Sequence, residues 1–482
     1  MVTPVWRLLP LILGPALAGI LLLLPPPGNM PVTAWSAVAI TSWMVVWWLS
    51  EAVPLPATAL LPIPFMPFLD IGDIKSVCAS YAHPLIFLFL GGFILAAAMQ
   101  RCGLHRRIAL NIISFVGTSN KRIIAGFMLA TSFLSMWISN TATTVMMYAV
   151  GLSVIQLVAS RVGSASASRF GIALMLGIAY SASIGGVGTL IGTPPNALLA
   201  SILQSSYSIE IDFVTWMMFG LPVVVVMLLI AWVLLAVVLF PTADTDESVP
   251  PSILKEEMAQ LGPPTRTEKM VLVVFALAVM GWCFGKPIGV VTGVPINDTA
   301  VAILASVALF AIPVSLNKQE FLVDWETAKK LPWGILLIFG GGLAITGAFN
   351  TSGLAAYLGN SMKGFGTLGV WTLVLVTGGI MIALTEITSN TASAATFLPI
   401  LGAIAVGLGY DPRLLMIPVA LGASMAFMMP VATPPNAIVF SYDGLKIQDM
   451  VRAGIWLNIV ATLVCFGAMY LLAGLVFGIA PA

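Results

Sequence analysis

The chain has 482 residues, of which 59% are hydrophobic and only 8% are charged, and its mean hydropathy is +1.05. This amount of apolar surface exceeds what one soluble core can bury, so the composition predicts an all-α membrane protein embedded in the lipid bilayer. The formal net charge of +1 and the lack of a basic stripe argue against nucleic acid as a partner. The four cysteines have no paired spacing, so we expect neither a disulfide nor a metal cluster.

About eleven windows approach the length that crosses a bilayer. In chain order they lie at 8–26, 33–50, 53–70, 84–100, 170–205, 212–240, 268–285, 298–313, 333–350, 412–440 and 453–478. Two further apolar stretches, 123–158 and 367–409, are each divided near the middle by a polar Ser-Asn-Thr run. Each arm is too short to cross comfortably, so we predict two re-entrant hairpins there.

The distribution of positive charge predicts the orientation. With a cytoplasmic N-terminus, sixteen of the 20 Lys and Arg residues fall in inner segments, and only Lys75, Lys286, Lys363 and Arg413 fall in outer segments. The first hairpin then opens to the cytoplasm and the second to the outside, which is the pattern of an inverted-topology repeat. We expect this arrangement in a bacterial inner membrane.

Short sequences that recur within the chain predict its division into repeats. Gly91-Gly92 and Gly103-Leu104 recur 250 positions later as Gly341-Gly342 and Gly353-Leu354. The predicted organisation is therefore a first transmembrane helix at 1–32, a first repeat at 33–240, a cytoplasmic linker at 241–269 and a second repeat at 270–482. The linker holds the longest polar stretch.

Two short motifs occur twice in the same order. Ser-Asn-Thr-Ala stands at 139–142 and 389–392, and Thr-Pro-Pro-Asn stands at 193–196 and 433–436. Hydroxyl and amide oxygens at a helix break suit a hard monovalent cation, whereas amide protons and free N–H groups suit a carboxylate. Two successive prolines force a membrane helix to unwind, which leaves half-helices whose N-termini attract anions and whose C-terminal carbonyls coordinate sodium. The paired motifs predict a transport site.

These duplicated motifs make the chain resemble the divalent anion/sodium symporter family, the sodium-coupled di- and tricarboxylate transporters. The resemblance covers essentially the whole chain and implies a homodimer that transports by an elevator-type movement. It implies one Na+ near Ser135, Ser139, Asn140 and Gly192, and a second near Thr385, Thr388, Asn390 and Ala432. It implies that the substrate anion contacts Asn140, Thr141, Thr193, Pro194, Asn390, Thr391, Thr433 and Pro434.

The tips and the Thr-Pro-Pro-Asn runs contain no Lys or Arg. A dianion must then be stabilised by neutral donors, helix ends and co-bound cations, so its affinity should depend on sodium. We therefore predict a sodium-coupled importer of succinate, malate, fumarate or related anions. A dicarboxylate or sulfate exchanger without net sodium coupling remains the alternative.

Other classes of protein fit less well. A channel should show a repeated filter of carbonyls or a charged ring, and an enzyme should show a titratable constellation, and the sequence has neither. Glu386, three residues before Ser389, leaves two roles open. As an intramembrane carboxylate it is a candidate proton carrier or a modulator of the second cation site, and equally a cap for polar backbone at the tip.

Overall fold

The computed structural model describes residues 8–117, 119–162, 164–241, 258–259, 261–315, 317, 319–362 and 369–479. These residues are almost entirely helical, which confirms the predicted all-α membrane class. The sheet content described is one antiparallel pair, β1 (Pro313–Ser315) and β2 (Glu320–Phe321). Eight helices of the described part are long and apolar enough to cross a membrane, and five shorter apolar helices accompany them. The number of eleven crossings and the re-entrant course of the hairpins stay predictions.

The first half of the chain is built from helices that follow the predicted windows and from short helices between them. Their bounds are α1 (Leu8–Leu23), α2 (Val32–Ser50), α3 (Leu55–Thr58), α4 (Pro62–Phe68), α5 (Ile74–Ala79), η2 (Ser80–Ala82), α6 (Pro84–Arg101), α7 (Leu104–Val116), α8 (Asn120–Ser135), α9 (Asn140–Val162), α10 (Ser164–Gly186), α11 (Pro194–Tyr207), α12 (Phe213–Val233) and the π-helix η3 (Leu234–Leu239). The window at 53–70 is divided between α3 and α4, because its prolines favour helix starts over a helix interior.

The second half follows the same plan. Its helices are α14 (Arg266–Thr292), α15 (Asp298–Ala311), α16 (Trp325–Lys329), α17 (Trp333–Thr351), α18 (Leu354–Met362), α19 (Val370–Thr385), α20 (Asn390–Gly407), α21 (Arg413–Gly422), α22 (Pro434–Phe440) and α23 (Ile447–Phe477). The apolar windows did not predict α7 and α18. Each follows a left-handed glycine, Gly103 at φ 78° or Gly353 at φ 80°, which turns the chain sharply after the preceding helix.

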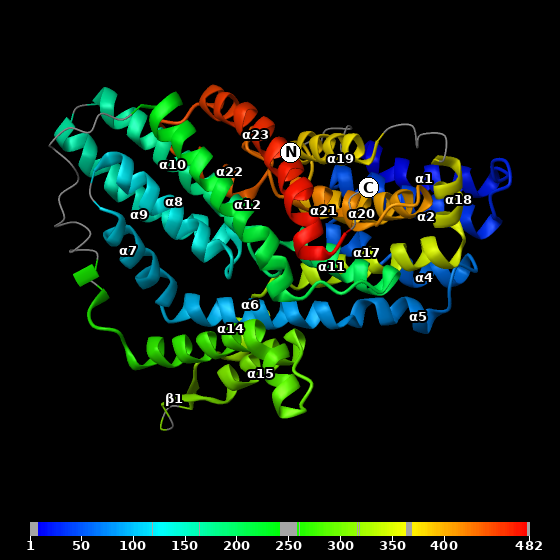
Figure 1. The fold of residues 1–482 in the computed structure, drawn as a ribbon, viewed down its shortest axis with the longest axis horizontal. Coiled ribbons are helices and arrows are strands. Elements are labelled where there is room, and N and C mark those ends of the chain that lie inside the picture. The colour runs from blue at the N-terminus through cyan, green and yellow to red at the C-terminus, as the bar shows by residue number, and fades with distance from the viewer. Residues whose placement is uncertain are drawn as a thin grey trace.

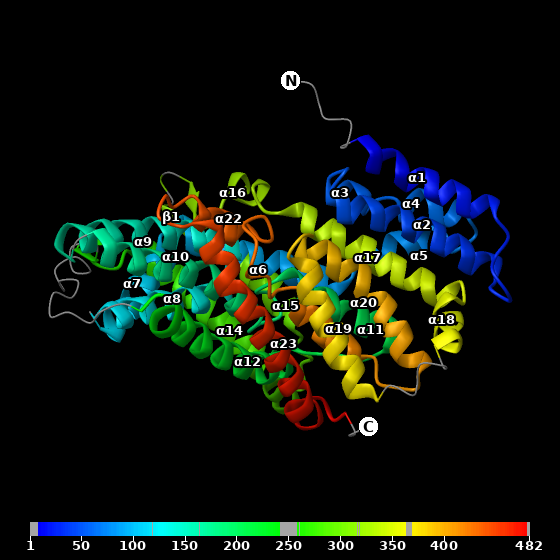
Figure 2. The ribbon, with the colours of Figure 1, turned by 90° about the horizontal axis from the view of Figure 1, so that it is seen from above.

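The broken helices pack across the two halves. The first hairpin, α8 and α9, lies with α10 at the left of Figure 1, whereas α19, α20 and α21 pack together to the right of its centre. The short helix α22 packs against α9 and α10, and α11 packs against α20 and α21. Each Thr-Pro-Pro-Asn helix therefore lies against the hairpin of the other half, and the view from above in Figure 2 shows the same interleaving around the middle of the molecule.

The contact between α8 and α10 is close because α10 carries a glycine at the crossing. A Cβ atom on Gly185 would overlap the backbone of Ser132, so only glycine allows the two helices to approach to this distance. This approach brings the end of α10 beside the end of α8, where the first Ser-Asn-Thr run begins.

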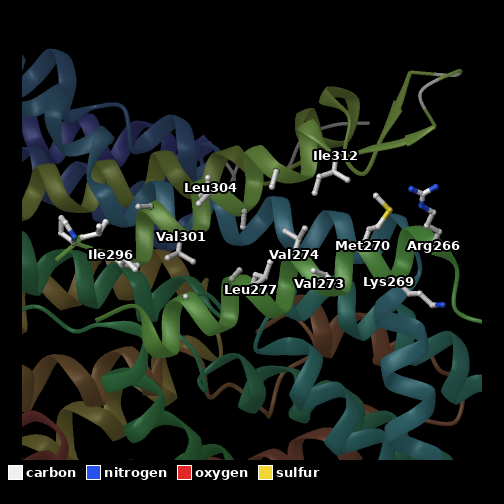
Figure 3. Close-up of a pocket in the computed structure, with 17 residues that line it drawn as sticks. Arg266, Lys269, Met270, Val273, Val274, Leu277, Ile296, Val301, Leu304 and Ile312 are labelled. Atoms are coloured by element: carbon white, nitrogen blue, oxygen red, sulfur yellow. The ribbon is translucent and has the colours of Figure 1, made fainter. Parts of the chain in front are cut away.

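Helices α14 and α15 pack against each other and against α6 at the lower side of Figure 1, and Figure 3 shows the pair in close-up. The groove between them has a volume of about 870 Å³ and is lined by apolar side chains such as Val273, Leu277 and Leu304, with Arg266 and Lys269 at one end. The groove contains none of the residues of the four motif runs.

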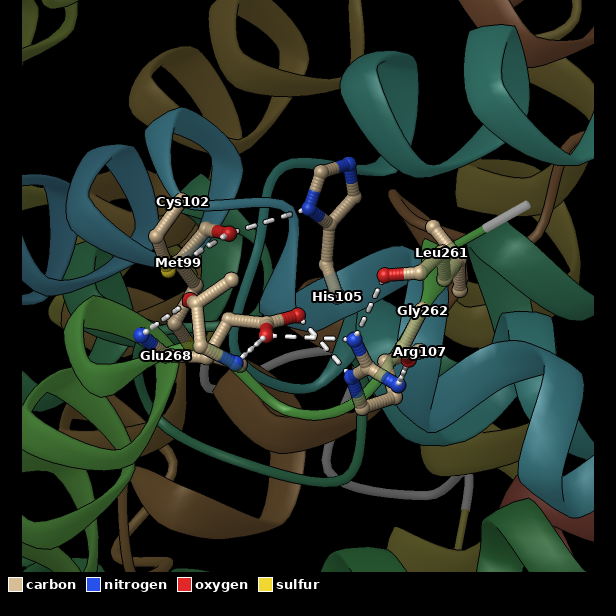
Figure 4. Close-up of polar contacts among 8 residues, drawn as sticks. Met99, Cys102, His105, Arg107, Leu261, Gly262 and Glu268 are labelled. Carbon is tan, nitrogen blue, oxygen red and sulfur yellow. Dashed lines mark hydrogen bonds and ion pairs between the residues drawn. The ribbon is translucent and has the colours of Figure 1, made fainter. Parts of the chain in front are cut away.

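An ion pair fixes the start of α14 against α7 (Figure 4). The Arg107 guanidinium donates to both carboxylate oxygens of Glu268, at 2.9 and 3.2 Å, and to the carbonyls of Leu261 and Gly262. Glu268 also forms a capping box with Thr265. Helix α14 begins at Arg266, so the end of the predicted 241–269 linker is already helical, and residues 242–257 and 260 lie outside the described residues.

Candidate functional site

The four motif runs meet at one cavity of about 950 Å³. All eight residues predicted from the sequence to contact the substrate line it: Asn140, Thr141, Thr193, Pro194, Asn390, Thr391, Thr433 and Pro434. Four of the predicted sodium-site residues, Ser139, Gly192, Thr388 and Ala432, also line it. Segments separated by up to about 300 residues in the chain thus surround a single hollow.

Four helices begin at the wall of this cavity. Helices α9 and α20 begin at Asn140 and Asn390, and α11 and α22 begin at Pro194 and Pro434. The N-terminus of a helix carries a partial positive charge and N–H groups without helical acceptors. The prolines cost the two short helices no hydrogen bond, because the first N–H groups of a helix have no acceptor within it. The convergence of these N-termini favours an anion in the cavity.

Behind each Ser-Asn-Thr tip, a buried hydroxyl lies between two oxygen atoms. Ser135 Oγ is close to both Asn140 Oδ1 and the Ala182 carbonyl, and Thr385 Oγ1 lies 2.7 Å from Asn390 Oδ1 and 3.1 Å from the Ala423 carbonyl. A hydroxyl has one proton, so it can donate to only one of its two neighbours at a time. Each tip therefore holds more oxygen lone pairs than protons, an arrangement that a small cation stabilises.

Gly186 lies close to two of the residues predicted for the first Na+ site. A Cβ atom on Gly186 would lie 2.8 Å from Asn140 Oδ1 and 3.2 Å from the Gly192 carbonyl oxygen. The Asn140 amide nitrogen would lie 3.1 Å from the same Cβ, so a larger side chain at this position would displace the whole Asn140 amide. Ser135, which does not line the cavity, reaches the same predicted site through its contact with Asn140.

The last residue of each Thr-Pro-Pro-Asn run holds the unwound segment in place, a role that was not predicted from the sequence. The Asn196 amide donates to the carbonyls of Gly186, Val187 and Thr189, and the Asn436 amide donates to those of Ala426 and Met429. Both side chains are completely buried. They satisfy carbonyls that the helix break leaves without partners, and the repetition of the motif is the sequence feature that pointed to them.

Glu386 caps the second unwound segment. Its carboxylate accepts hydrogen bonds from the backbone N–H groups of Phe427, Met428 and Met429 at 2.7 to 3.0 Å and from the Asn458 amide at 2.7 Å. The side chain is 4% exposed, so these four donors surround it in the interior. Of the two roles left open by the sequence, this geometry corresponds to the backbone cap.

Two charged residues that were not predicted to belong to the site also line the cavity. Lys330 follows α16, and Glu51 follows α2 with a left-handed backbone at φ 50°. Both come from segments far from the motif runs in sequence, so no local pattern identified them.

Comparison with known proteins decides the family. Residues 5–479 match the family described as the sodium:sulfate symporter transmembrane region. The chain belongs to this family. Its members are membrane transporters, so the protein is a transporter and not an enzyme, and the family resemblance inferred from the duplicated motifs is confirmed.

Curated relatives of this sodium:sulfate symporter family protein are similar along nearly their whole length. The chain is 42% identical to the sodium-dependent dicarboxylate transporter SdcS of Staphylococcus saprophyticus, covering 98% of this chain and 93% of the relative. It is 40% identical to SdcS of Staphylococcus aureus, with coverage of 98% and 92%.

Two solved structures share the fold at low sequence identity. The YdaH transporter of Alcanivorax borkumensis has a TM-score of 0.55 at 15% identity and covers 93% of this chain and 99% of its own. The efflux pump MtrF of Neisseria gonorrhoeae has a TM-score of 0.55 at 14% identity, with coverage of 97% and 98%. These similarities support the membrane-transporter fold alone.

Proposed function

We propose that this protein is a sodium-coupled secondary active transporter that imports C4-dicarboxylates such as succinate, malate and fumarate, or related di- and tricarboxylates. The observation that carries the proposal is the cavity at which four helix N-termini and two oxygen clusters meet. The names of the relatives, sodium-dependent dicarboxylate transporters, point to the same substrate class.

The two oxygen clusters are the proposed Na+ sites. We assign the first site to Ser135, Ser139, Asn140 and the Gly192 carbonyl, and the second to Thr385, Thr388, Asn390 and the Ala432 carbonyl. In the structure, the Thr388 hydroxyl contacts the Leu384 carbonyl and the Ser393 hydroxyl. Support for both sites is the contact of each buried hydroxyl with the amide oxygen of its tip. Hydroxyl, amide and carbonyl oxygens are neutral hard ligands, which suits a monovalent ion that must bind and leave during each cycle.

The eight cavity residues named above are the proposed substrate contacts. The free N–H groups at the start of α9 and α20, together with the Asn amides and Thr hydroxyls, supply hydrogen bonds to one carboxylate from each half. The Thr193 hydroxyl lies 3.4 Å from that of Ser424, so the two halves of the chain are in contact beside the proposed substrate site. A four-carbon dianion, with a carboxylate at each end, matches a site with a set of donors on either side.

Sodium coupling follows from the balance of charge. The motif runs contribute no positive side chain to a cavity that is to hold two negative charges. Two Na+ ions beside the helix N-termini neutralise the dianion, so each ligand raises the affinity of the other. Without bound Na+ the cavity lacks this compensation, so the dianion alone binds weakly.

The larger-scale features belong to the same proposal. We propose two inverted repeats, with hairpins at 123–158 and 367–409, in a homodimer of the bacterial inner membrane with a cytoplasmic N-terminus. Support for the repeats comes from the hydroxyl–amide pair, which recurs at an offset of 250 residues, and from the Asn amide contacts, which recur at 240. An elevator movement would carry the cavity from one membrane face to the other.

The test is succinate uptake into proteoliposomes that contain the purified protein. An inward Na+ gradient should drive accumulation, and replacement of Na+ by K+ or choline should abolish it. Undiminished uptake in choline would rule out obligatory coupling, and counterflow of succinate without any Na+ would favour an anion exchanger instead. Failure of succinate, malate and fumarate to compete with one another would overturn the substrate class.

A further inference from the structure

A second cavity of about 440 Å³ adjoins the one that holds the motif runs. Its wall includes Gln100 and Arg101 at the end of α6 and Thr327 in α16. The two cavities share four lining residues, Phe93, Ser139, Lys330 and Pro332. The two cavities therefore meet at these residues, and one of them, Lys330 in the segment after α16, is exposed.

The other positively charged residues near the junction of the two cavities form ion pairs. Arg101 is 2.7 Å from Asp324, and Lys329 pairs with Glu326 one turn away. Hydrogen bonds from the Thr327 hydroxyl and backbone N–H hold the pKa of Asp324 below its usual value, so this carboxylate is ionised at neutral pH and balances Arg101. Neither pair leaves a free positive charge for a ligand.

Lys330 differs from these neighbours. Among the residues that the structure describes, no carboxylate lies within 4.0 Å of its ammonium group, and it is the one Lys or Arg that lines the main cavity. Glu51 lines the same cavity without forming an ion pair with it. The charge of Lys330 is thus available to an anion in the hollow.

The backbone around Lys330 is held by hydrogen bonds, so the fold sets the point from which this side chain extends. The Lys330 N–H donates to the Thr327 carbonyl, and the next N–H, of Leu331, donates to the Ala328 carbonyl. The Trp333 indole donates to that same carbonyl at 3.0 Å. These bonds close the end of α16 and direct the chain past the junction of the two cavities.

We propose that Lys330 forms a vestibular anion site, which holds one carboxylate of the substrate on its way between solution and the four helix N-termini. The inference rests on the proposed function and adds a residue outside the motif runs. Ser139, which also lies at the junction, supplies a hydroxyl donor to the same carboxylate. While the dianion approaches and is still roughly 10 Å away in water, the charge of Lys330 raises its local concentration by about three- to five-fold at low ionic strength, so we expect this change in kcat/KM.

The experiment compares Lys330→Cys with Lys329→Cys, its exposed and ion-paired neighbour. Each purified variant is treated in detergent with a cationic trimethylammonium-ethyl, an anionic sulfonatoethyl or a neutral methyl thiosulfonate reagent, and is then reconstituted. Sodium-driven succinate uptake is measured at low and at high salt. Wild-type protein treated in parallel accounts for the native cysteines, and thermal unfolding of each variant verifies its folding.

We expect Lys330→Cys to lower kcat/KM by about three- to five-fold at low salt. The cationic reagent should restore it, the anionic reagent should lower it further, and high salt should reduce all these differences. Lys329→Cys should not respond to the sign of the reagent. Equal responses of the two variants, or an equal loss with all three reagents at position 330, would overturn the vestibular site. Absence of sodium-driven uptake by the wild type would instead refute the proposed function.

Discussion

The cap formed by Glu386 gives the most specific prediction. The Glu386→Gln substitution replaces one acceptor oxygen by an NH₂ group while the shape of the side chain is kept. The Met429 N–H contacts Oε2 alone and would face another donor if the amide nitrogen took that position, whereas the Met428 N–H also donates to Oε1 and would keep an acceptor. In the other amide orientation the NH₂ group would face the Phe427 N–H and the Asn458 amide. Either orientation leaves at least one buried donor without an acceptor.

The magnitude follows from these contacts. A hydrogen bond to a charged group contributes about 1.5 to 3 kcal/mol, and a buried donor left unsatisfied costs about 1 to 3 kcal/mol. With one donor left unsatisfied in the better orientation, we expect Glu386→Gln to destabilise the protein by about 1 to 3 kcal/mol. The loss should appear as a lower Tm in detergent and as a raised KM for succinate, because the cap holds the segment that leads to Thr433.

The assay distinguishes a capping role of Glu386 from a role as proton carrier. Thermal unfolding and sodium-driven uptake are measured across pH for the wild type, for Glu386→Gln and for Glu326→Gln, an exposed control. The cap predicts a lower Tm for Glu386→Gln with an unchanged shape of the pH profile. A variant with the Tm of the wild type that has lost the pH dependence of transport would refute this reasoning and support proton transfer by Glu386.

Two further predictions test the site and the fold. Gly186→Ala should raise the Na+ concentration for half-maximal uptake by about ten-fold or more, since its Cβ would displace the Asn140 amide, whereas Gly467→Ala, which meets no atom within 4 Å, should leave it unchanged. Equal Na+ dependence of the two variants would contradict the first oxygen cluster. Glu268→Gln should lower the free energy of unfolding by about 3 kcal/mol, because it leaves the largely buried guanidinium of Arg107 without a charge partner. A Tm equal to that of the wild type in differential scanning fluorimetry would contradict it.

Much of the site could be predicted because its causes are local. Successive prolines and a Ser-Asn-Thr run interrupt a helix wherever they stand, so the starts of α9, α11, α20 and α22 follow from the residues themselves. The internal repeat could be predicted in the same way, because both motifs occur twice in the same order. The amphipathic helix α7 was missed because polar residues such as Arg106, Arg107 and Asn111 interrupt its apolar residues, so it contains no continuous apolar window.

The partners of individual polar residues could not be predicted in this way. Glu386 binds N–H groups more than 40 residues further along the chain, and Lys330 shares a cavity with Ser139, which lies in the other half. The sequence shows that a buried carboxylate needs donors but does not show which donors. Its two possible roles were therefore equally compatible with the residues around it.

By itself, the sequence determined that this is a helical membrane protein with four helix breaks in two matching pairs, because apolar length and helix-breaking residues act through adjacent residues of the chain. Only the tertiary structure decided that the breaks of both halves surround one cavity, that Glu386 caps the segment before the second Thr-Pro-Pro-Asn run and that Lys330 lines the cavity. These features depend on how distant helices pack, as where Gly185 allows α10 to cross α8, and on the contacts that such packing creates.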